Sequence, residues 1–241
     1  MRAETRHQLK QDRFSRLTID AAGSAVHWTV EHQKALTVAA VLVLVVVGAT
    51  LGAWFYLDQQ DQKASVLLSQ ANRTLDTPVR PAGIPAEPNF PSFGSLKERA
   101  LAAQKQFQEI VNKYPHTRSA DMARYFLGVT SAQLGDNAAA ERELQQVASM
   151  RNDDLAALGR FALASVYRNS NRTKDAIDLY NQLASKPTRT VGKVMAQLQL
   201  AATYQDAQQP AEAKRIYEQI QKENPSTDAA QIASAKLQNL K

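Results

Sequence analysis

The stretch AKRIYEQIQKENP, residues 213–225, contains a pattern that this chain repeats at a fixed distance. Ala213, Tyr217 and Ile220 are spaced so that they share one side of a helix, and Pro225 follows that helix. Earlier copies of the pattern begin at Ala103, Ala140 and Ala176. The successive alanines are therefore 37, 36 and 37 residues apart. A fixed period of this length is typical of a stack of helical units, each of which buries its apolar face only against its neighbours.

A second helix precedes these alanines and repeats as well. A leucine followed by a small residue stands 13 residues before the alanine in three copies, at Leu127-Gly128, Leu163-Ala164 and Leu200-Ala201. Three residues after the small residue come Ser131, Tyr167 and Tyr204. Together the two helices resemble the tetratricopeptide repeat, whose pattern is Leu-Gly-x2-Tyr, then Ala-x3-Phe, then Pro. The resemblance implies an all-α fold, in which residues 95–241 form an α-solenoid of helical hairpins with a C-terminal capping helix. Such stacks hold other proteins and seldom catalyse reactions.

The composition excludes several kinds of active site. The chain has 241 residues and no cysteine, which excludes a disulfide framework, a thiol nucleophile and a cysteine-based zinc site. His27 and His32 are five residues apart, so they do not share a helical face as two metal ligands four residues apart would. No phosphate-binding loop or nucleophile motif occurs. We therefore predict no enzymatic activity, no cofactor, no metal and no small-molecule substrate.

The net positive charge suggests nucleic acid as a partner, but the distribution of the charges does not support it. The formal net charge is +6 and the pI is about 9.5. Residues 95–241 contain 20 Lys and Arg against 15 Asp and Glu, spread without a dense basic run or an aromatic stacking platform. We predict a mildly basic, solvated surface and no nucleic-acid partner.

Residues 1–34 form a polar, basic tail. Apolar residues at helical spacing within it are Phe14, Leu17, Ala21, Ala25 and Trp28. The pattern predicts either an amphipathic helix on a membrane surface or a short cytosolic helix.

Residues 35–57, ALTVAAVLVLVVVGATLGAWFYL, contain no charged residue and 12 Leu, Val or Phe residues. As a helix they would extend roughly 34 Å, enough for a hydrocarbon core of about 30 Å. The Leu, Val and Phe residues favour insertion by roughly 4–7 kcal/mol. A cleaved signal peptide is the alternative, but its apolar region is normally about 7–15 residues long and close to the N-terminus. We predict an uncleaved transmembrane helix.

The flanking charges predict the orientation of this span. Six Lys and Arg residues precede it, whereas Asp58, Asp61 and a single Lys63 follow it closely. The positive-inside rule then places the N-terminus in the cytoplasm and the repeats on the other side of the membrane. For a bacterial inner membrane, that side is the periplasm. Within the span, Gly48 and Gly52 form a Gly-x3-Gly pair, which makes them candidates for contact with another membrane helix.

Two segments connect the span to the repeats. Residues 58–76 continue as an amphipathic helix, whose apolar face is formed by Ala64, Leu67, Leu68, Ala71 and Leu75. Residues 77–94 contain five prolines, so neither a helix nor a central strand can run through them. This segment is either an insertion in the first hairpin or a flexible tether between the membrane and the repeats.

The resemblance also implies a concave groove, lined by the first helix of each hairpin. The predicted groove residues are Met122, Tyr125 and Val129; Leu158, Phe161 and Ser165; and Met195, Leu198 and Ala202, with Arg168 and Gln205 at its polar edge. Methionine and aromatic side chains open to water would suit varied apolar segments of a partner. Alternatively, these side chains pack against adjacent hairpins or against the proline-rich segment.

In its order of segments the chain resembles the YfgM-like family, the inner-membrane ancillary subunit of the SecYEG translocon. The stretch YPHTRSA, residues 114–120, is also similar to repeats of the division coordinator CpoB and the lipoprotein BamD. Both differ from this chain: the first has a cleaved signal peptide, and the second has an N-terminal lipidated cysteine. The first resemblance implies a scaffold for the translocon, its periplasmic chaperone or emerging polypeptides. The alternative is an envelope adaptor for cell division, peptidoglycan synthesis or outer-membrane assembly.

Overall fold

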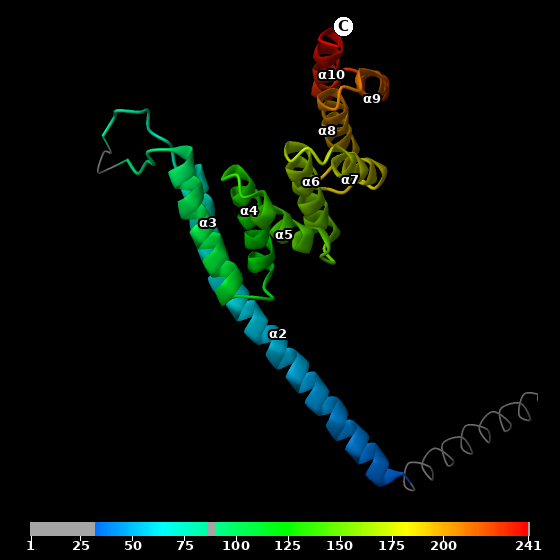
Figure 1. The fold of residues 1–241 in the computed structure, drawn as a ribbon. Coiled ribbons are helices and arrows are strands. Elements are labelled where there is room, and N and C mark those ends of the chain that lie inside the picture. Colours follow the sequence, from blue (N-terminus) through cyan, green and yellow to red (C-terminus); the bar gives the residue numbers. More distant parts are fainter. Residues whose placement is uncertain (1–31, 86–89, 241) are drawn as a thin grey trace, which may run out of the picture. The chain divides into compact units, whose positions relative to one another are not determined.

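The computed structural model describes residues 32–85 and 90–240, and these residues form helices joined by loops, with one isolated β-bridge (Figure 1). The all-α prediction is confirmed for this part of the chain. The chain divides into two units, Met1–Tyr56 and Leu57–Lys241. The amphipathic helix predicted within residues 1–34 lies almost entirely outside the described residues.

Helix α2 (Gln33–Asp76) is the longest helix, with 44 residues. Among the described residues it is the one helix that is long and apolar enough to cross a membrane. Its apolar side chains within the first unit are exposed, and Leu44 is 70% exposed. A Cβ atom added at Gly48 or Gly52 would have no neighbour within 4 Å, so both glycines are open on the helix surface. The helix is compatible with a single-pass membrane anchor.

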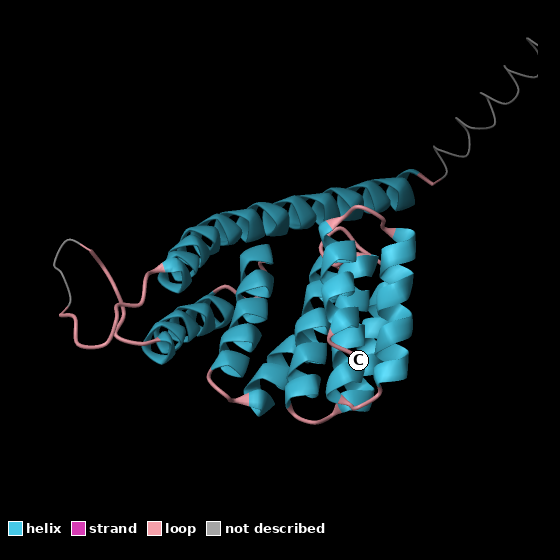
Figure 2. Cartoon of the chain, turned by 90° about the horizontal axis from the view of Figure 1, so that it is seen from above, coloured by secondary structure: helices cyan, strands magenta, loops and turns pink. Residues whose placement is uncertain are grey.

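The unit Leu57–Lys241 is a stack of helices in which each helix packs against the next one in the sequence. Figure 2 shows these helices joined by loops. After α2 the helices are α3 (Leu96–Lys113), α4 (Arg118–Gln133), α5 (Asn137–Ala148), α6 (Asp153–Asn169), α7 (Thr173–Ser185), α8 (Lys193–Asp206), α9 (Pro210–Glu223) and α10 (Asp228–Gln238). Helix α4 also contacts α6, and α10 contacts both α9 and α8, as expected for the predicted capping helix at the end of a solenoid.

The residues of the repeated pattern form the core of this stack. The four repeated alanines, Ala103, Ala140, Ala176 and Ala213, are completely buried. The large residue four positions later is also buried in each copy, at Phe107, Leu144, Tyr180 and Tyr217. The small residue of the preceding helix permits close approach, because a Cβ atom added at Gly128 would lie 2.6 Å from the Cγ atom of Leu144. The repeat pattern in the sequence is therefore a pattern of contacts between the two helices of a hairpin.

The second half of α2 is the first helix of the first hairpin. Its predicted apolar face belongs to one buried cluster with Ala103 and Phe107 of α3. The Oγ1 atom of Thr74 donates a hydrogen bond to the Oε1 atom of Gln106, at 2.9 Å. The Oδ1 atom of Asp61 accepts the backbone N–H of Ser119 at 2.8 Å and so satisfies a donor at the N-terminus of α4. Residues 57–76 are thus packed into the repeats.

The proline-rich segment begins at the end of α2 and returns to the start of α3. Near its base, the N–H of Arg80 donates to the carbonyl of Phe93 at 2.9 Å, and the N–H of Phe93 donates to the carbonyl of Pro78 at 3.0 Å. The Nη1 atom of Arg80 also donates to the carbonyl of Ser92 at 2.9 Å. These bonds hold the two ends together, which is the geometry of an insertion within the first hairpin.

The turns inside the hairpins require a left-handed residue at the same position. Gly135, Asn171 and Gln208 have φ values of 84°, 60° and 57°. A side chain in this region costs roughly 1–2 kcal/mol, and glycine avoids that cost. We expect Gln208→Gly to raise the free energy of unfolding by about 0.5–1 kcal/mol, measured by urea denaturation. Gly135→Ala is the converse change and should lower it by about 1 kcal/mol. A stabilising Gly135→Ala would contradict this account.

Candidate functional site

The structure places all the predicted groove residues on the first helices of successive hairpins. Helix α4 carries Met122, Tyr125 and Val129, helix α6 carries Leu158, Phe161, Ser165 and Arg168, and helix α8 carries Met195, Leu198, Ala202 and Gln205. None of these residues is buried; Met195 is 47% exposed and the others are partly exposed. The predicted residues therefore form a surface that solvent reaches, and they do not belong to the interior.

Some of these side chains also pack against the core. Tyr125, Leu158, Phe161 and Leu198 all contact the larger buried cluster, which extends from α5 to α10. The ring of Phe161 meets the buried ring of Tyr180 edge-on, with centroids 5.6 Å apart. One side of each residue is thus fixed by packing while another side is open, so the surface is held in place before any partner binds.

The two polar edge residues are occupied within the stack. The Nε atom of Arg168 lies 2.9 Å from the Oδ2 atom of Asp206, and its Nη1 atom donates to the Oε1 atom of Gln199 at 3.0 Å. The Oε1 atom of Gln205 accepts a hydrogen bond from the hydroxyl of Tyr217 at 2.8 Å. Arg168 therefore links α6 to α8, and a partner would have to compete for both side chains.

Three tyrosines near this surface, Tyr125, Tyr180 and Tyr217, remain neutral at physiological pH. Burial raises the pKa of Tyr125 and Tyr217 above the ordinary value of a phenol, and it raises the pKa of Tyr180 to about 12. The hydroxyl of Tyr180 is also buried and has no hydrogen-bond partner among the described residues. Tyr180 and Tyr217 are buried, Tyr125 is partly exposed, and all three lack the perturbation toward neutral pH that acid–base chemistry requires.

The unpaired hydroxyl predicts a stabilising substitution. Tyr180→Phe removes a buried polar group that lacks a hydrogen bond, so we expect the free energy of unfolding to rise by about 1 kcal/mol. Tyr217→Phe is the matched control, because the hydroxyl of Tyr217 donates to Gln205. That control should lose about 1 kcal/mol in the same urea denaturation. Equal effects of the two substitutions would show that Tyr180 has a hydrogen-bond partner in solution.

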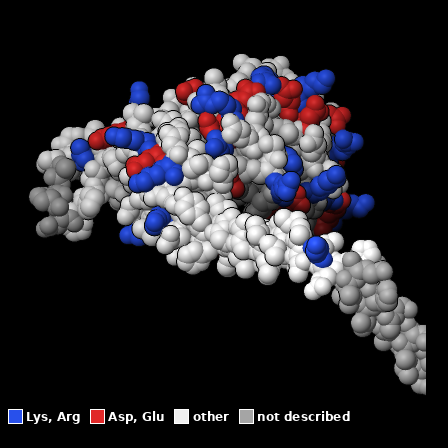
Figure 3. Space-filling view, turned by 90° about the horizontal axis from the view of Figure 1, so that it is seen from below, with Lys and Arg blue, Asp and Glu red and all other residues white. Residues whose placement is uncertain are grey.

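The charged side chains do not form a site of one sign on the visible face of the repeats. Figure 3 shows Lys and Arg side chains interspersed with Asp and Glu side chains there. Within the described residues, no group of three or more His, Asp or Glu side chains could hold a metal ion. The surface chemistry of this face is that of a mixed, solvated protein surface.

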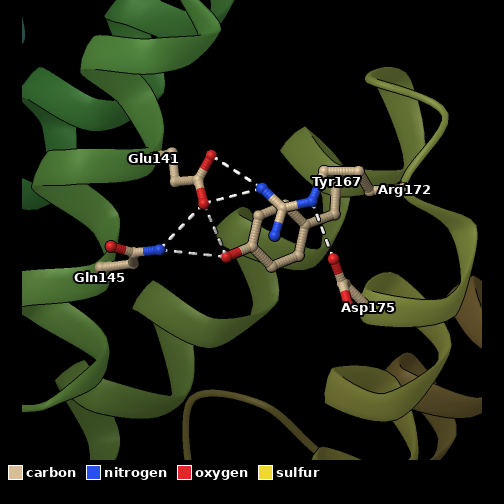
Figure 4. Close-up of polar contacts among 5 residues, drawn as sticks. All are labelled: Glu141, Gln145, Tyr167, Arg172 and Asp175. Atoms are coloured by element: carbon tan, nitrogen blue, oxygen red, sulfur yellow. Dashed lines mark hydrogen bonds and ion pairs between the residues drawn. The ribbon is translucent and has the colours of Figure 1, made fainter.

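A junction that the sequence did not predict connects the second and third hairpins (Figure 4). The Nη1 atom of Arg172 donates to both carboxylate oxygens of Glu141, at 2.8 and 3.0 Å, and its Nε atom donates to Asp175 at 2.8 Å. The guanidinium lies over the ring of Tyr167, 3.9 Å from the centroid. Hydrogen bonds to Glu141 and Asp175 raise the pKa of Arg172.

Tyr167, on α6, also belongs to this junction and bonds to two residues of α5. Its hydroxyl donates to the Oε1 atom of Glu141 at 3.0 Å, and the Nε2 atom of Gln145 donates to the Tyr167 hydroxyl at 3.2 Å. The only signal in the sequence is that Tyr167 occupies a repeated position. The identity of its partners depends on helices far apart along the chain.

Comparison with known families agrees with this architecture. A family model described as a tetratricopeptide repeat-like domain matches residues 26–186. A second model, described as a tetratricopeptide repeat, matches residues 195–227. No curated protein matches the chain. The first match includes the apolar part of α2 as well as the helices up to α7.

Proposed function

We propose a scaffold function for this chain, which belongs to the tetratricopeptide repeat-like domain family. In this proposal the chain is a single-pass inner-membrane protein whose periplasmic repeats hold protein partners. Proteins of this family are generally non-enzymatic interaction scaffolds, and no catalytic family is indicated. Within that role we propose that the chain is an accessory of the protein-export translocon and its periplasmic chaperone network. The partners would be translocon subunits, a chaperone or emerging polypeptides.

The apolar surface of α4, α6 and α8 carries this proposal. Four of its side chains, those of Tyr125, Leu158, Phe161 and Leu198, are partly exposed and packed against the core, which suits recognition of apolar segments at a low entropic cost. Met195 is the most accessible residue of this surface and its flexible thioether can adapt to different partners. The exposed apolar half of α2 supports the membrane anchor.

The topology can be tested directly. Alkaline phosphatase fused to the C-terminus folds only after export, so we expect an active fusion in intact bacterial cells. A fusion at residue 32, before the span, should be inactive and serves as the control. An inactive C-terminal fusion would place the repeats in the cytoplasm and overturn both the export role and any other periplasmic role.

The partner class can be tested by cross-linking from the groove. A photo-reactive amino acid at Met195 should capture translocon subunits, a periplasmic chaperone or exported chains in intact cells. The same residue at Lys214, exposed on α9 of the same hairpin, is the matched control and should not capture them. Recovery of only division, wall-synthesis or outer-membrane assembly proteins from position 195 would replace the export role with the envelope-adaptor role. Equal recovery of the same proteins from both positions would contradict the proposal that the groove binds them.

A further inference from the structure

The turns between the two helices of three successive hairpins, α4–α5, α6–α7 and α8–α9, have the same backbone conformation. In each, a backbone N–H bonds to the carbonyl five residues earlier: Asp136 to Ser131 at 2.9 Å, Arg172 to Tyr167 at 2.8 Å and Gln209 to Tyr204 at 2.9 Å. The residue before each donor is the left-handed residue of the turn. Because the backbones match, the side chains at these positions can be compared directly.

The first junction, between the first and second hairpins, has a smaller residue at one of these positions and a residue of opposite charge at another. Ser131 stands where Tyr167 stands in the next hairpin, and Asp136 stands where Arg172 stands. Gln104 directly follows its repeated alanine, as Glu141 does. The Nε2 atom of Gln104 donates to the Oγ atom of Ser131 at 2.9 Å, so the first junction keeps a bond between the same two positions. It lacks the phenol ring and the guanidinium.

A cleft lies where these two groups are missing. Its volume is about 870 Å³, and it lies between α3 and α5 with α4 beneath it. This is within the usual size of a ligand site. Its lining includes apolar groups from Leu101, Leu127 and Ala139 and polar groups from Gln104, Gln108 and Asp136. The cleft is on the second-helix side of the hairpins and shares no residue with the predicted groove.

The polar groups of the cleft differ in how far they are already bonded. Glu143 is occupied, because its two carboxylate oxygens pair with Arg124 at 2.8 Å and Arg142 at 3.0 Å. Asp136 is exposed and has no ion pair among the described residues. One of its oxygens accepts the N–H of Ala139 at 3.0 Å as the helix cap, which leaves the other oxygen available to a cation.

We propose that this cleft binds a partner polypeptide through a tyrosine and a neighbouring basic residue. The phenol would occupy the space that Tyr167 fills in the next hairpin, within reach of the carboxamides of Gln104 and Gln108. The basic side chain would pair with Asp136, which stands at the position of Arg172, so this ion pair would have the opposite polarity to the pair that Arg172 forms with Glu141. The inference goes beyond the proposed function, because it concerns a second surface and does not depend on topology or on the translocon.

The probe is the blocked peptide acetyl-Tyr-Gly-Arg-amide, whose two side chains lie on the same side of an extended backbone. Saturation-transfer NMR with the full chain in detergent micelles should show contact with the tyrosine ring. Replacing the tyrosine by alanine should abolish the signal. Replacing the arginine by glutamate should weaken binding by about tenfold or more, the effect of losing a charge-assisted hydrogen bond.

Two variants locate the binding within the cleft. Ser131→Tyr supplies the missing ring from the chain itself and should abolish the peptide signal. Asp136→Asn keeps the cap acceptor and should remove the preference for the arginine peptide over the glutamate peptide. Asp153→Asn, exposed in the first turn of α6, is the control and should leave binding unchanged.

The proposal is overturned if a folded Ser131→Tyr variant binds the peptide as the unmodified chain does. Because Ser131 is buried, that variant can fail to fold, and Asp136→Asn then decides. An unchanged preference for arginine in Asp136→Asn overturns the proposal, as does equal binding of the tyrosine and alanine peptides.

Discussion

The 241-residue chain with Leu44→Arg and Val46→Arg is expected to leave the membrane fraction. These residues lie in the middle of the exposed apolar half of α2. Each arginine at the centre of a span costs about 2.5–3.5 kcal/mol, and the replaced apolar residue gives up a further 0.3–0.6 kcal/mol or so. The two substitutions together cost about 6–8 kcal/mol, which cancels the roughly 4–7 kcal/mol that favours insertion.

Sodium carbonate extraction of bacterial membranes measures this effect. The unmodified chain should stay in the pellet, and the doubly substituted chain should appear in the supernatant. Leu44→Val combined with Val46→Leu exchanges the two side chains without adding charge, so this control should remain in the pellet. Retention of the arginine variant in the carbonate pellet would mean that α2 is not held by its apolar segment.

Phe107→Ala is expected to cost the first hairpin about 3–5 kcal/mol of unfolding free energy. Phe107 is completely buried, and its ring stacks on that of Phe126 with centroids 5.2 Å apart. The loss leaves a cavity that joins α3, α4 and the second half of α2. Because α5 to α10 form a separate buried cluster, the damage should be concentrated in α3, α4 and the second half of α2.

Hydrogen exchange of the backbone amides separates local from global damage. In Phe107→Ala, the amides of α3 should exchange at least 100-fold faster, while those of α7 should change little. Phe90→Ala makes the same substitution at a side chain that is 69% exposed, and it should change stability by less than about 0.5 kcal/mol. Equal acceleration in α3 and α7 would instead indicate one cooperative unit.

The fold was predictable because every repeat contains the same pattern of buried residues. Ala103, Phe107 and Ile110 recur as the same types of residue in later copies, and each copy is buried in the structure. The period was therefore enough to predict helices, hairpins and their buried faces. The long apolar helix was predictable for a similar reason, since its length and composition do not depend on any other part of the chain.

The side-chain partners were not predictable in the same way. Arg168 was predicted at the polar edge of the groove, and the repeat period did not predict its partners, Asp206 and Gln199 of the next hairpin. Gly159 carried no signal, yet a Cβ atom added there would lie 2.8 Å from the backbone nitrogen of Ala148. Both contacts depend on how far one helix is rotated and how closely it approaches another. A repeat period constrains neither quantity to the required precision.

The closed base of the proline-rich insertion has a practical consequence. Because Arg80 and Phe93 hold the two ends together, the length between them is uncoupled from the packing of the first hairpin. Doubling the length of a flexible loop costs only about 0.6 kcal/mol in closure entropy. An epitope tag or a fluorescent reporter could therefore be carried between these anchor points with the helical stack left intact.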